Sequence, residues 1–309
     1  METIERGRIS GLFDELGGSV ADGFPAIHSA VHRTGGGTAY LREPGVVLLA
    51  RPQTNVRGLG GFLDGFDSSL GFPGYVDDPT ALPDSSQLCK TAGQLCYASF
   101  GPRRTTNENA ASYFERLTSA GHGSVLEHAS FSFLLYGISR SVTHELVRHR
   151  AGVGISQVSQ RYVSGSVLRF VERPEYAADA ELHRLFEERI DGAAAGYEAM
   201  AGRLLERQGQ GAALLEADAA TDARKKVQQT ARSLLPNETE APMVFTGNVR
   251  ALRHIIEMRA DEHAESEIRN LAVRLFLCLV TADPILFGDY KLQTLPDGTH
   301  KVTTKHRKA

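Results

Sequence analysis

The chain has 309 residues, enough for one large domain or two modest ones. Its 34 Lys and Arg residues nearly balance 37 Asp and Glu residues, which argues against nucleic-acid binding through bulk charge. No apolar run approaches the ~18–20 residues of a membrane-spanning helix, and the first residues lack the apolar core of a signal peptide. Three cysteines without a CxxC pair indicate neither a disulfide framework nor a zinc knuckle, so we expect a cytoplasmic protein without a membrane partner.

The composition changes along the chain and predicts a main domain with flanking segments. Residues 1–45 are glycine-rich and short of periodicity, which predicts an N-terminal extension. The apolar run Val46–Ala50 predicts a buried strand, and residues 51–86 have the Gly, Pro, Asp and Ser content of a loop insertion. We expect the main domain to span residues 46–293, followed by a basic tail over residues 294–309.

Helical and strand-like patterns alternate from about residue 87 onward. Their mixture predicts an α+β fold, in which strands deliver the chain into helices. Asn248 has the residue type of a good N-cap for a helix beginning at Val249. The predicted helices are Asn107–Ala120, 140–150, 178–208, 218–235 and 249–281, the last as one helix or a pair. The predicted strands are Ala129–Tyr136, 160–172 and Met243–Thr246, and Ser124–Glu127 is predicted to form one short turn.

The densest cluster of polar side chains lies in the segment HELVRHRAGVGISQVSQRYV. On a helix, Glu145, Arg148 and His149 share one face, and Arg150 stands where the following glycines release the backbone. Arginine gives planar, bidentate hydrogen bonds to oxyanions, and above all to phosphate. Two interpretations follow from the motif alone: an anion-binding wall, or a surface cluster neutralised by carboxylates elsewhere.

The same segment continues with Gln157, Ser159 and Arg161. Alternate spacing on an extended chain would point these three side chains to one side. The segment thus combines the end of a helix, a glycine loop and the polar beginning of a strand. This combination indicates the wall of a pocket rather than a solvated face.

A second signal lies in the segment NVRALRHIIEMRADEH. Its apolar stripe runs through Leu252, Ile255 and Ile256, and the next position of the stripe is Arg259. A charge in an apolar stripe is costly unless it is paired. Arg259 is therefore either a member of a buried ion pair or an arginine directed at a ligand, where it could stabilise an anion on a substrate ring.

Histidine spacing gives no sign of a metal site. His144–Arg148 reads HExxR, so the second histidine of a zinc-protease motif is missing. His122 and His128 are six residues apart, and His254 and His263 are nine apart, neither of which is a familiar ligand spacing on a helix. We expect no catalytic metal.

Two other candidate motifs also fail. Gly58–Leu63 approaches the dinucleotide pattern GxGxxG, but leucine stands at the last glycine position, so we expect a loop there. Cys96 has no nucleophile signature around it, and its apolar neighbours favour a packed cysteine.

Five blocks between about residues 88 and 290 follow one another in a familiar order. They are Gly121–His128, Arg148–Arg150 with Ser159–Tyr162, Ala231–Pro236, Asn248–Arg250 and Met258–His263. In order and approximate spacing they resemble the flavin-dependent thymidylate synthase family, with its arginine-histidine-arginine signature and the serine and arginine downstream.

This resemblance implies the fold of that family: a twisted sheet flanked by long helices, assembled as a homotetramer whose active sites lie at subunit interfaces. It implies FAD as cofactor, with methylenetetrahydrofolate supplying the carbon and NADPH the hydride. The base of a uridine 5′-monophosphate would be methylated at C5. Because reduced flavin can drive this transfer without a covalent enzyme nucleophile, the lack of a convincing catalytic cysteine is expected.

The resemblance also implies roles for individual residues. Arg259 matches the arginine that stabilises the ring anion of the base, which makes it the expected catalytic residue. The expected cofactor-binding residues are His122, Ser124, Arg148, His149, Arg150, Gln157, Asn248, Arg250 and His254. The expected nucleotide-binding residues are Glu145, Arg148, Gln157, Ser159, Arg161, Arg232 and Arg259.

Two departures from the family pattern bear on the substrate. The segment 151–158, between the signature and its serine, is one residue longer than in the family, and the N-terminal extension and loop insertion are additional. Both suggest a specialised branch, and one such branch methylates UMP in the biosynthesis of polyoxin-type nucleoside antibiotics. We therefore favour a UMP-accepting enzyme, with two alternatives: a thymidylate synthase strictly on dUMP, or a non-catalytic homologue that binds flavin or nucleotide.

Overall fold

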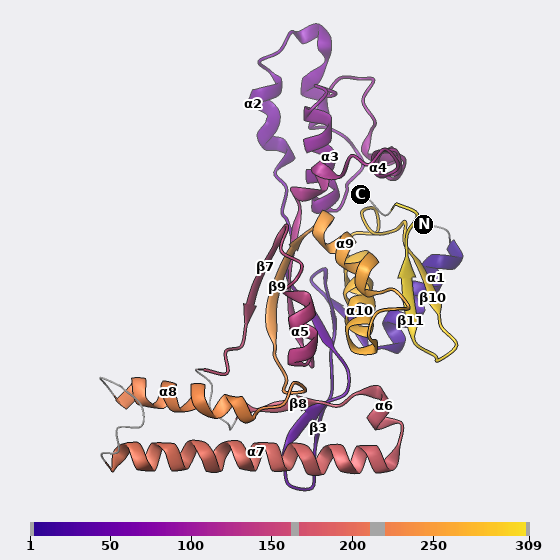
Figure 1. Ribbon diagram of the computed structural model, residues 1–309. Helices are drawn as coiled ribbons and strands as arrows, with labels where there is room; N and C mark the ends of the chain where they lie inside the picture. The colour runs from indigo at the N-terminus through magenta and orange to yellow at the C-terminus, as the bar shows by residue number, and fades with distance from the viewer. Residues whose placement is uncertain (1–2, 162–166, 211–219, 307–309) are drawn as a thin grey trace.

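The computed structural model describes residues 3–161, 167–210 and 220–306. A six-stranded sheet with the strand order β1-β2-β5-β6-β9-β7 forms its centre, and neighbouring strands in it are antiparallel (Figure 1). Its strands are β1 (Gly18–Ala21), β2 (Phe24–Ile27), β5 (Gly45–Ala50), β6 (Ser130–Tyr136), β7 (Val153–Gln157) and β9 (Met243–Asn248). The predicted α+β class is confirmed, as are the strands expected at 46–50, 129–136 and 243–246.

Helices lie on and around this sheet. The α-helices are α1 (Thr3–Glu15), α2 (Gly60–Leu63), α3 (Asp84–Leu95), α4 (Ala110–Ser119), α5 (Arg140–Leu146), α6 (Pro174–Ala177), α7 (Ala180–Gly209), α8 (Ala220–Ala231), α9 (Val249–Arg259) and α10 (Ser266–Ala282). The 3-10 helices are η1 (Val56–Leu59), η2 (Ser68–Leu70), η3 (Phe72–Tyr75), η4 (Asn107–Asn109), η5 (Gly123–Glu127) and η7 (Arg232–Leu234). Within the described ranges, no helix has both the length and the apolar character that crossing a bilayer requires.

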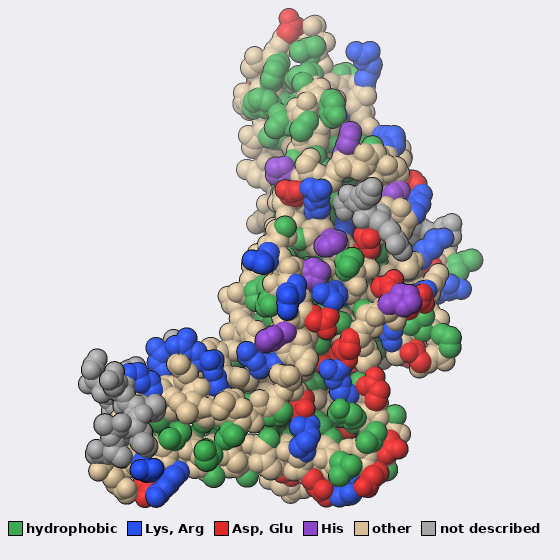
Figure 2. All heavy atoms as spheres, in the orientation of Figure 1, with side chains coloured by type: hydrophobic (Ala, Val, Ile, Leu, Met, Phe, Trp, Pro, Cys, Tyr) green, Lys and Arg blue, Asp and Glu red, His purple; other side chains and the backbone are tan. Residues whose placement is uncertain are grey.

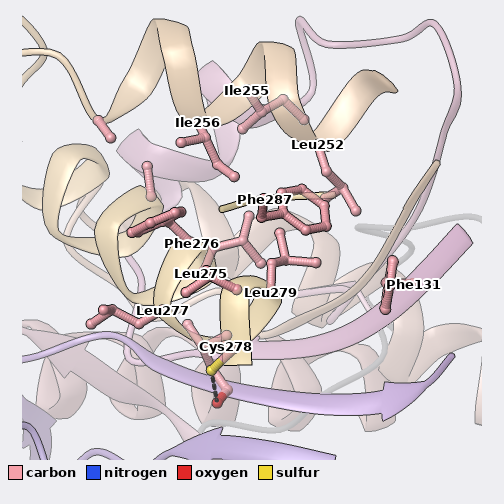
Figure 3. Packing of buried hydrophobic residues seen from close by; sticks show 14 of the residues in the cluster. Phe131, Leu252, Ile255, Ile256, Leu275, Phe276, Leu277, Cys278, Leu279 and Phe287 are labelled. Carbon is pink, nitrogen blue, oxygen red and sulfur yellow. Dashed lines mark hydrogen bonds between the residues drawn. The ribbon is translucent and has the colours of Figure 1, made fainter. Parts of the chain in front are cut away.

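The main core forms where α9 and α10 cover the sheet. In β6 the alternate side chains Phe131 and Phe133 are buried, so the period-two pattern points one face of the strand into the core. Nearly every residue from Ile268 to Val280 of α10 is buried, because this helix packs against both the sheet and α9. Figure 3 shows side chains of α9, such as Ile255, meeting those of α10 around Phe287. This packing fixes α9, and with it the position of the residues at its end.

The expected helix over 249–281 is a pair, α9 and α10, separated by a turn. The long helices expected near 178–208 and 218–235 are α7 and α8, of which α8 ends in η7 before Pro236 (Figure 1). Residues 218 and 219 lie outside the described residues. The predicted cap at Asn248 is confirmed, since its Oδ1 accepts a hydrogen bond from the backbone N–H of Ala251 at 2.9 Å.

The N-terminal 45 residues contain more regular structure than their sequence suggested. Besides α1, they supply β1 and β2 to the central sheet. They also supply β3 (Val31–Arg33) and β4 (Ala39–Leu41), which form a three-stranded sheet with β8 (Arg169–Val171). Strands of three or four residues offer too few positions for a hydrophobic period to show.

The region 51–86, expected to be a loop, forms single-turn helices around a small core to which Phe100 also contributes. Leu63, Phe72, Tyr75 and Phe100 are buried against one another in it. The loop predicted at Gly58–Leu63 was wrong, because η1 and α2 occupy it. We call residues 56–76 the aromatic lobe; Figure 1 shows this lobe, with α2, at the end of the molecule away from α7.

Two other expectations changed. The strand expected over 160–172 is limited to β8, with residues 162–166 outside the description, while β7 occupies the stretch expected to be a glycine loop. The backbone of β7 pairs with β9, and this tertiary pairing overrides the weak strand propensity of Gly154. The C-terminal region contains the hairpin β10 (Lys291–Thr294) and β11 (His300–Thr303), whose Val302 is buried in the main core.

Candidate active site

The guanidinium of Arg259, at the end of α9, is held by two side chains from α5 and the turn after it. Its Nη1 donates to Glu145 Oε2 at 2.6 Å, and its Nε donates to His149 Nε2 at 3.0 Å. The Arg259 side chain remains 22% exposed. Arg259 is therefore ion-paired, although the pair is only partly buried, and its side chain is still accessible.

His149 is neutral in this arrangement. Burial, followed by the nearby Arg259 guanidinium and the neighbouring His254, lowers the pKa of His149 to about 4. Because Nε2 accepts the hydrogen bond from Arg259, the single ring proton of the neutral form is on Nδ1. The ring of His254 lies edge-on at a centroid distance of 5.8 Å, so α9 contributes a second histidine to the same cluster.

The position of α5 depends on a buried carboxylate. Ser139 caps α5 by accepting a hydrogen bond from the N–H of Val142, and its own N–H and hydroxyl donate to Glu267 at 2.7 and 2.8 Å. Burial raises the pKa of Glu267, while the bonds from Ser139 act in the opposite direction. This link fixes the start of α5 against α10 and so places Glu145 one and a half turns later.

A tight turn then carries the chain from Arg150 into β7. Gly152 has a φ of +72°, in the left-handed region, and a Cβ there would lie 2.6 Å from the side-chain nitrogen of Asn248. The backbone N–H of Asn248 also donates to the carbonyl of Gly152 at 2.9 Å. The glycine expected to release the backbone is thus needed for both its conformation and its close approach to the cap of α9.

Cationic side chains surround the cluster on its open side. Arg148 and Arg150 are exposed, and within the described residues neither forms an ion pair. Arg250 pairs with Glu127 at 2.6 Å and so links α9 to η5, the turn that carries the exposed Ser124. Figure 2 shows Lys, Arg and His side chains gathered on this face, over α5 and α9. A set of unpaired guanidinium donors with hydroxyl and amide groups beside them suits the diphosphate of a dinucleotide such as FAD.

The other expected nucleotide ligands lie at the far end of β7. Gln157 ends this strand, Ser159 and Arg161 follow it, and Arg232 is exposed on η7. With a strand rise of about 3.3 Å per residue, Gly152 and Gln157 are roughly 16 Å apart. In the described residues no hydrogen bond joins Gln157, Ser159 or Arg232 to the Arg259 cluster. One chain therefore presents the two groups separately, where the sequence suggested a single wall.

His122 also lies apart from the Arg259 cluster. It lines a pocket of about 310 Å³ between α3 and α4, just before η5 begins.

Sequence reasoning missed the most buried arginine of α9. Arg253 is only 2% exposed and donates to both carboxylate oxygens of Asp289, at 2.7 and 2.8 Å. Its guanidinium carbon lies 4.9 Å from the centroid of the Tyr290 ring. The sequence did contain a sign of this burial, because Arg253 shares a helix face with the apolar residues Val249 and Ile256. Its partners are internal, so its role is structural.

Two further points concern cysteine and metal chemistry. Cys96, expected to be packed, is exposed at the end of α3, whereas Cys89 and Cys278 are buried. Its apolar sequence neighbours did not reveal that the helix ends there. Within residues 3–161, 167–210 and 220–306, no group of three or more His, Cys, Asp or Glu side chains is arranged to hold a metal ion.

Fold and site together define a mixed α+β protein with a cationic surface beside a neutral histidine. Residues 79–285 match the family model described as thymidylate synthase complementing protein. The chain is similar to the flavin-dependent thymidylate synthases of Mycobacterium sp. (strain KMS), 46% identical over 75% of this chain and 90% of that protein, and of Mycobacterium tuberculosis (strain ATCC 25177 / H37Ra), 43% identical over 70% and 84%. A third, from Mycolicibacterium vanbaalenii, is 45% identical over 75% and 90%. The chain belongs to the flavin-dependent thymidylate synthase family.

Proposed function

We propose that this protein catalyses the FAD-dependent reductive methylation of dUMP at C5, using methylenetetrahydrofolate and NADPH. The observation that carries the proposal is the guanidinium of Arg259, fixed by Glu145 and His149 yet accessible, in a chain of this family. The sequence alone led us to favour UMP. The similar proteins are all named thymidylate synthases, and thymidylate is a deoxyribonucleotide, so they favour dUMP; nothing in them supports a role in antibiotic biosynthesis.

Arg259 would activate the base. Attack by C5 on a one-carbon unit requires electron density at C5, which builds up when negative charge develops over the uracil ring. A fixed guanidinium stabilises that charge without reorganising during the reaction. Nε and Nη1 of Arg259 are occupied, whereas Nη2 makes no hydrogen bond with the described residues. Its N–H groups are the donors that would meet a carbonyl oxygen of the base.

His149 would hold the guanidinium of Arg259 in position. Only the neutral ring can accept the Nε–H of Arg259, and a protonated ring would also repel the guanidinium. The lowered pKa of His149 maintains this acceptor throughout the physiological pH range.

The residues around the cluster fit the expected flavin cofactor. Arg148, Arg150 and Arg250 would bind its diphosphate, and Ser124, Asn248, His149 and His254 would contact the remainder. The other two expected flavin contacts, Gln157 and His122, lie apart from this cluster within one chain. When bound, the flavin supplies the hydride chemistry that reduces the transferred carbon to a methyl group.

The separation of the two residue groups supports a shared active site. Glu145, Arg148 and Arg259 of one chain would meet the base, while Gln157, Ser159, Arg161 and Arg232 of another copy would bind the sugar and phosphate. β7 is an edge strand, and an unpaired edge favours association. Two apolar side chains beside it are exposed: Val158, which follows β7 directly, and Val244 of β9, which pairs with Ser156. We accordingly propose the homotetramer of the family.

Turnover on dUMP and UMP, measured side by side with FAD, NADPH and methylenetetrahydrofolate, tests the proposal. We expect yellow protein and methylation of dUMP. Preferential use of UMP would instead assign the protein to the UMP-methylating branch of the family. Flavin binding without any nucleotide-dependent NADPH oxidation would instead indicate a non-catalytic homologue, and protein that cannot be reconstituted with FAD would refute the flavin assignment.

A further inference from the structure

The pocket that His122 lines is strongly cationic. It lies between the C-terminal end of α3, the loop after it and α4. Its polar lining is dominated by arginine and aromatic side chains, and none of the described residues that line it is Asp or Glu. The side chains that matter here are Tyr97, Arg103, Arg104, Tyr113, Arg116 and His122.

The three arginines have no carboxylate partner within the described part of the chain. Arg103 makes neither an ion pair nor a side-chain hydrogen bond there. Arg116 makes two long hydrogen bonds, to Ser112 Oγ at 3.4 Å and to Thr105 Oγ1 at 3.3 Å. Arg104 bonds only backbone carbonyls. The hydrogen-bonding capacity of this wall is therefore largely unused.

Two neighbouring carboxylates, those of Glu115 and Asp78, make other contacts. Glu115, beside Arg116 in the sequence, pairs with Lys305 at 2.9 Å. Asp78 accepts hydrogen bonds from the backbone N–H groups of Thr80 and Asn107, at 3.2 and 2.9 Å. The positive charge of the pocket thus remains available for an anion.

Arg104 is held in place by the aromatic lobe. Its Nη2 donates to the carbonyl of Gly74 at 2.9 Å, and its guanidinium carbon lies 5.6 Å from the centroid of the Tyr75 ring. The hydroxyl of Tyr75 also donates to Gln94, a second lining residue, at 3.0 Å. The Nε of Arg104 is buried without a hydrogen-bond partner, which is costly unless a ligand supplies the acceptor. The pocket lining itself lies within the matched residues 79–285, whereas Gly74 and Tyr75, which hold Arg104, lie in a segment that the family model does not cover.

The geometry points to a binding site for the anionic glutamate tail of the folate substrate, an inference that rests on the proposed function. The carbon donor must lie beside the flavin, and His122 leads directly into the expected flavin turn η5. Tyr97 and Tyr113 suit the p-aminobenzoyl ring of a folate, and guanidinium groups suit its successive carboxylates. The phosphates of NADPH are a second source of anionic charge near the flavin. A pocket of about 310 Å³ is small for a dinucleotide, which favours the tail.

Steady-state kinetics with the mono- and triglutamate forms of methylenetetrahydrofolate test the inference. We expect a lower KM for the triglutamate in the unaltered protein. Arg103→Gln and Arg116→Gln should each raise that KM about two- to fivefold, and the KM for the monoglutamate by less. Arg203→Gln is the matched control, because this arginine is exposed on α7 and, among the residues that the structure describes, pairs with Glu206 alone. Calorimetric titration with pteroyltriglutamate, without NADPH or nucleotide, measures binding directly. Arg103→Gln and Arg116→Gln should bind it more weakly than the unaltered protein and Arg203→Gln do.

Three outcomes would overturn the inference: an unchanged ratio of the two KM values in both variants, a selective rise in the KM for NADPH, or loss of FAD from both variants. The second would assign the pocket to NADPH and the third to the cofactor. Absence of turnover in the unaltered protein counts against the proposed function, whereas arginine-dependent binding of pteroyltriglutamate would still support the site.

Discussion

Arg259 donates its Nε–H to His149 Nε2 at 3.0 Å, and this single bond ties the end of α9 to the turn after α5. The bond has a direction, because the histidine must be the acceptor. His149, three positions before Gly152, therefore restrains the guanidinium of Arg259, and Glu145 supplies the second restraint.

Replacing Arg259 by lysine should abolish most turnover while leaving the fold intact. Lysine keeps the charge but cannot reach Glu145, His149 and a substrate carbonyl with one ammonium group. Since removal of one preorganised donor typically costs about 10²–10³ in kcat, we expect a loss of that order. Single-turnover kinetics and the flavin absorbance measure it. Turnover within a few-fold of the unaltered enzyme would remove Arg259 from the catalytic role.

The lowered pKa of His149 predicts a pH dependence of stability. Burial and the Arg259 charge disfavour the protonated ring in the folded state, so the unfolded state binds more protons between the ordinary pKa of about 6.5 and the folded value of about 4. Stability should therefore fall as the pH falls through this window. Because other groups titrate there too, the relevant quantity is the difference between the unaltered protein and His149→Gln. Urea unfolding at pH 7, 6 and 5 should show a weaker decline in the variant; identical declines would contradict the assignment.

The sequence predicted the elements with a clear period and the residues with an unusual position. The stripe of α9 was visible, and so was the exceptional place of Arg259 in it. The partners of Arg259 were named only as part of a helix face, because contacts between α5 and α9 depend on how both pack on the sheet. β7 was missed since its strand character comes from pairing with β9, and the separation of Ser159 from the cluster follows from that strand.

The sequence also failed to predict the short helices and strands. The aromatic lobe has no periodic pattern, because its helices are single turns whose buried side chains meet around Phe100 from a different part of the chain. Arg253 escaped notice because its partner Asp289 lies beyond α10. Each of these features depends on contacts between segments that are distant in the sequence.

The Arg253–Asp289 pair should matter for stability far more than surface ion pairs do. Asp289→Ala leaves a guanidinium that is 2% exposed without its carboxylate. Breaking a buried pair in this way costs about 3–5 kcal/mol in the free energy of unfolding. Arg184→Ala, which breaks exposed pairs on α7, should lower the free energy of unfolding far less, because solvent screens these pairs. Denaturant unfolding of both variants measures the difference, and equal losses would show that Asp289 is not an essential partner.

Gly152 and Gly154 offer the sharpest comparison between two substitutions. They are two residues apart, but only Gly152 has a positive φ and a close neighbour at the Cβ position. Gly152→Ala places a methyl group at a φ of +72° and 2.6 Å from the Asn248 side chain, which caps α9. Strain at such a position costs about 1–3 kcal/mol, and relief by moving Asn248 would disturb the expected flavin contact as well. Gly154→Ala meets nothing closer than Thr246 Cβ at 3.8 Å and lies in β7, so it should be neutral or slightly stabilising. We expect Gly152→Ala to lower both the unfolding midpoint and FAD retention, with Gly154→Ala lowering neither. If both variants behave alike, the conformation of the turn is not what connects Arg150 to the site.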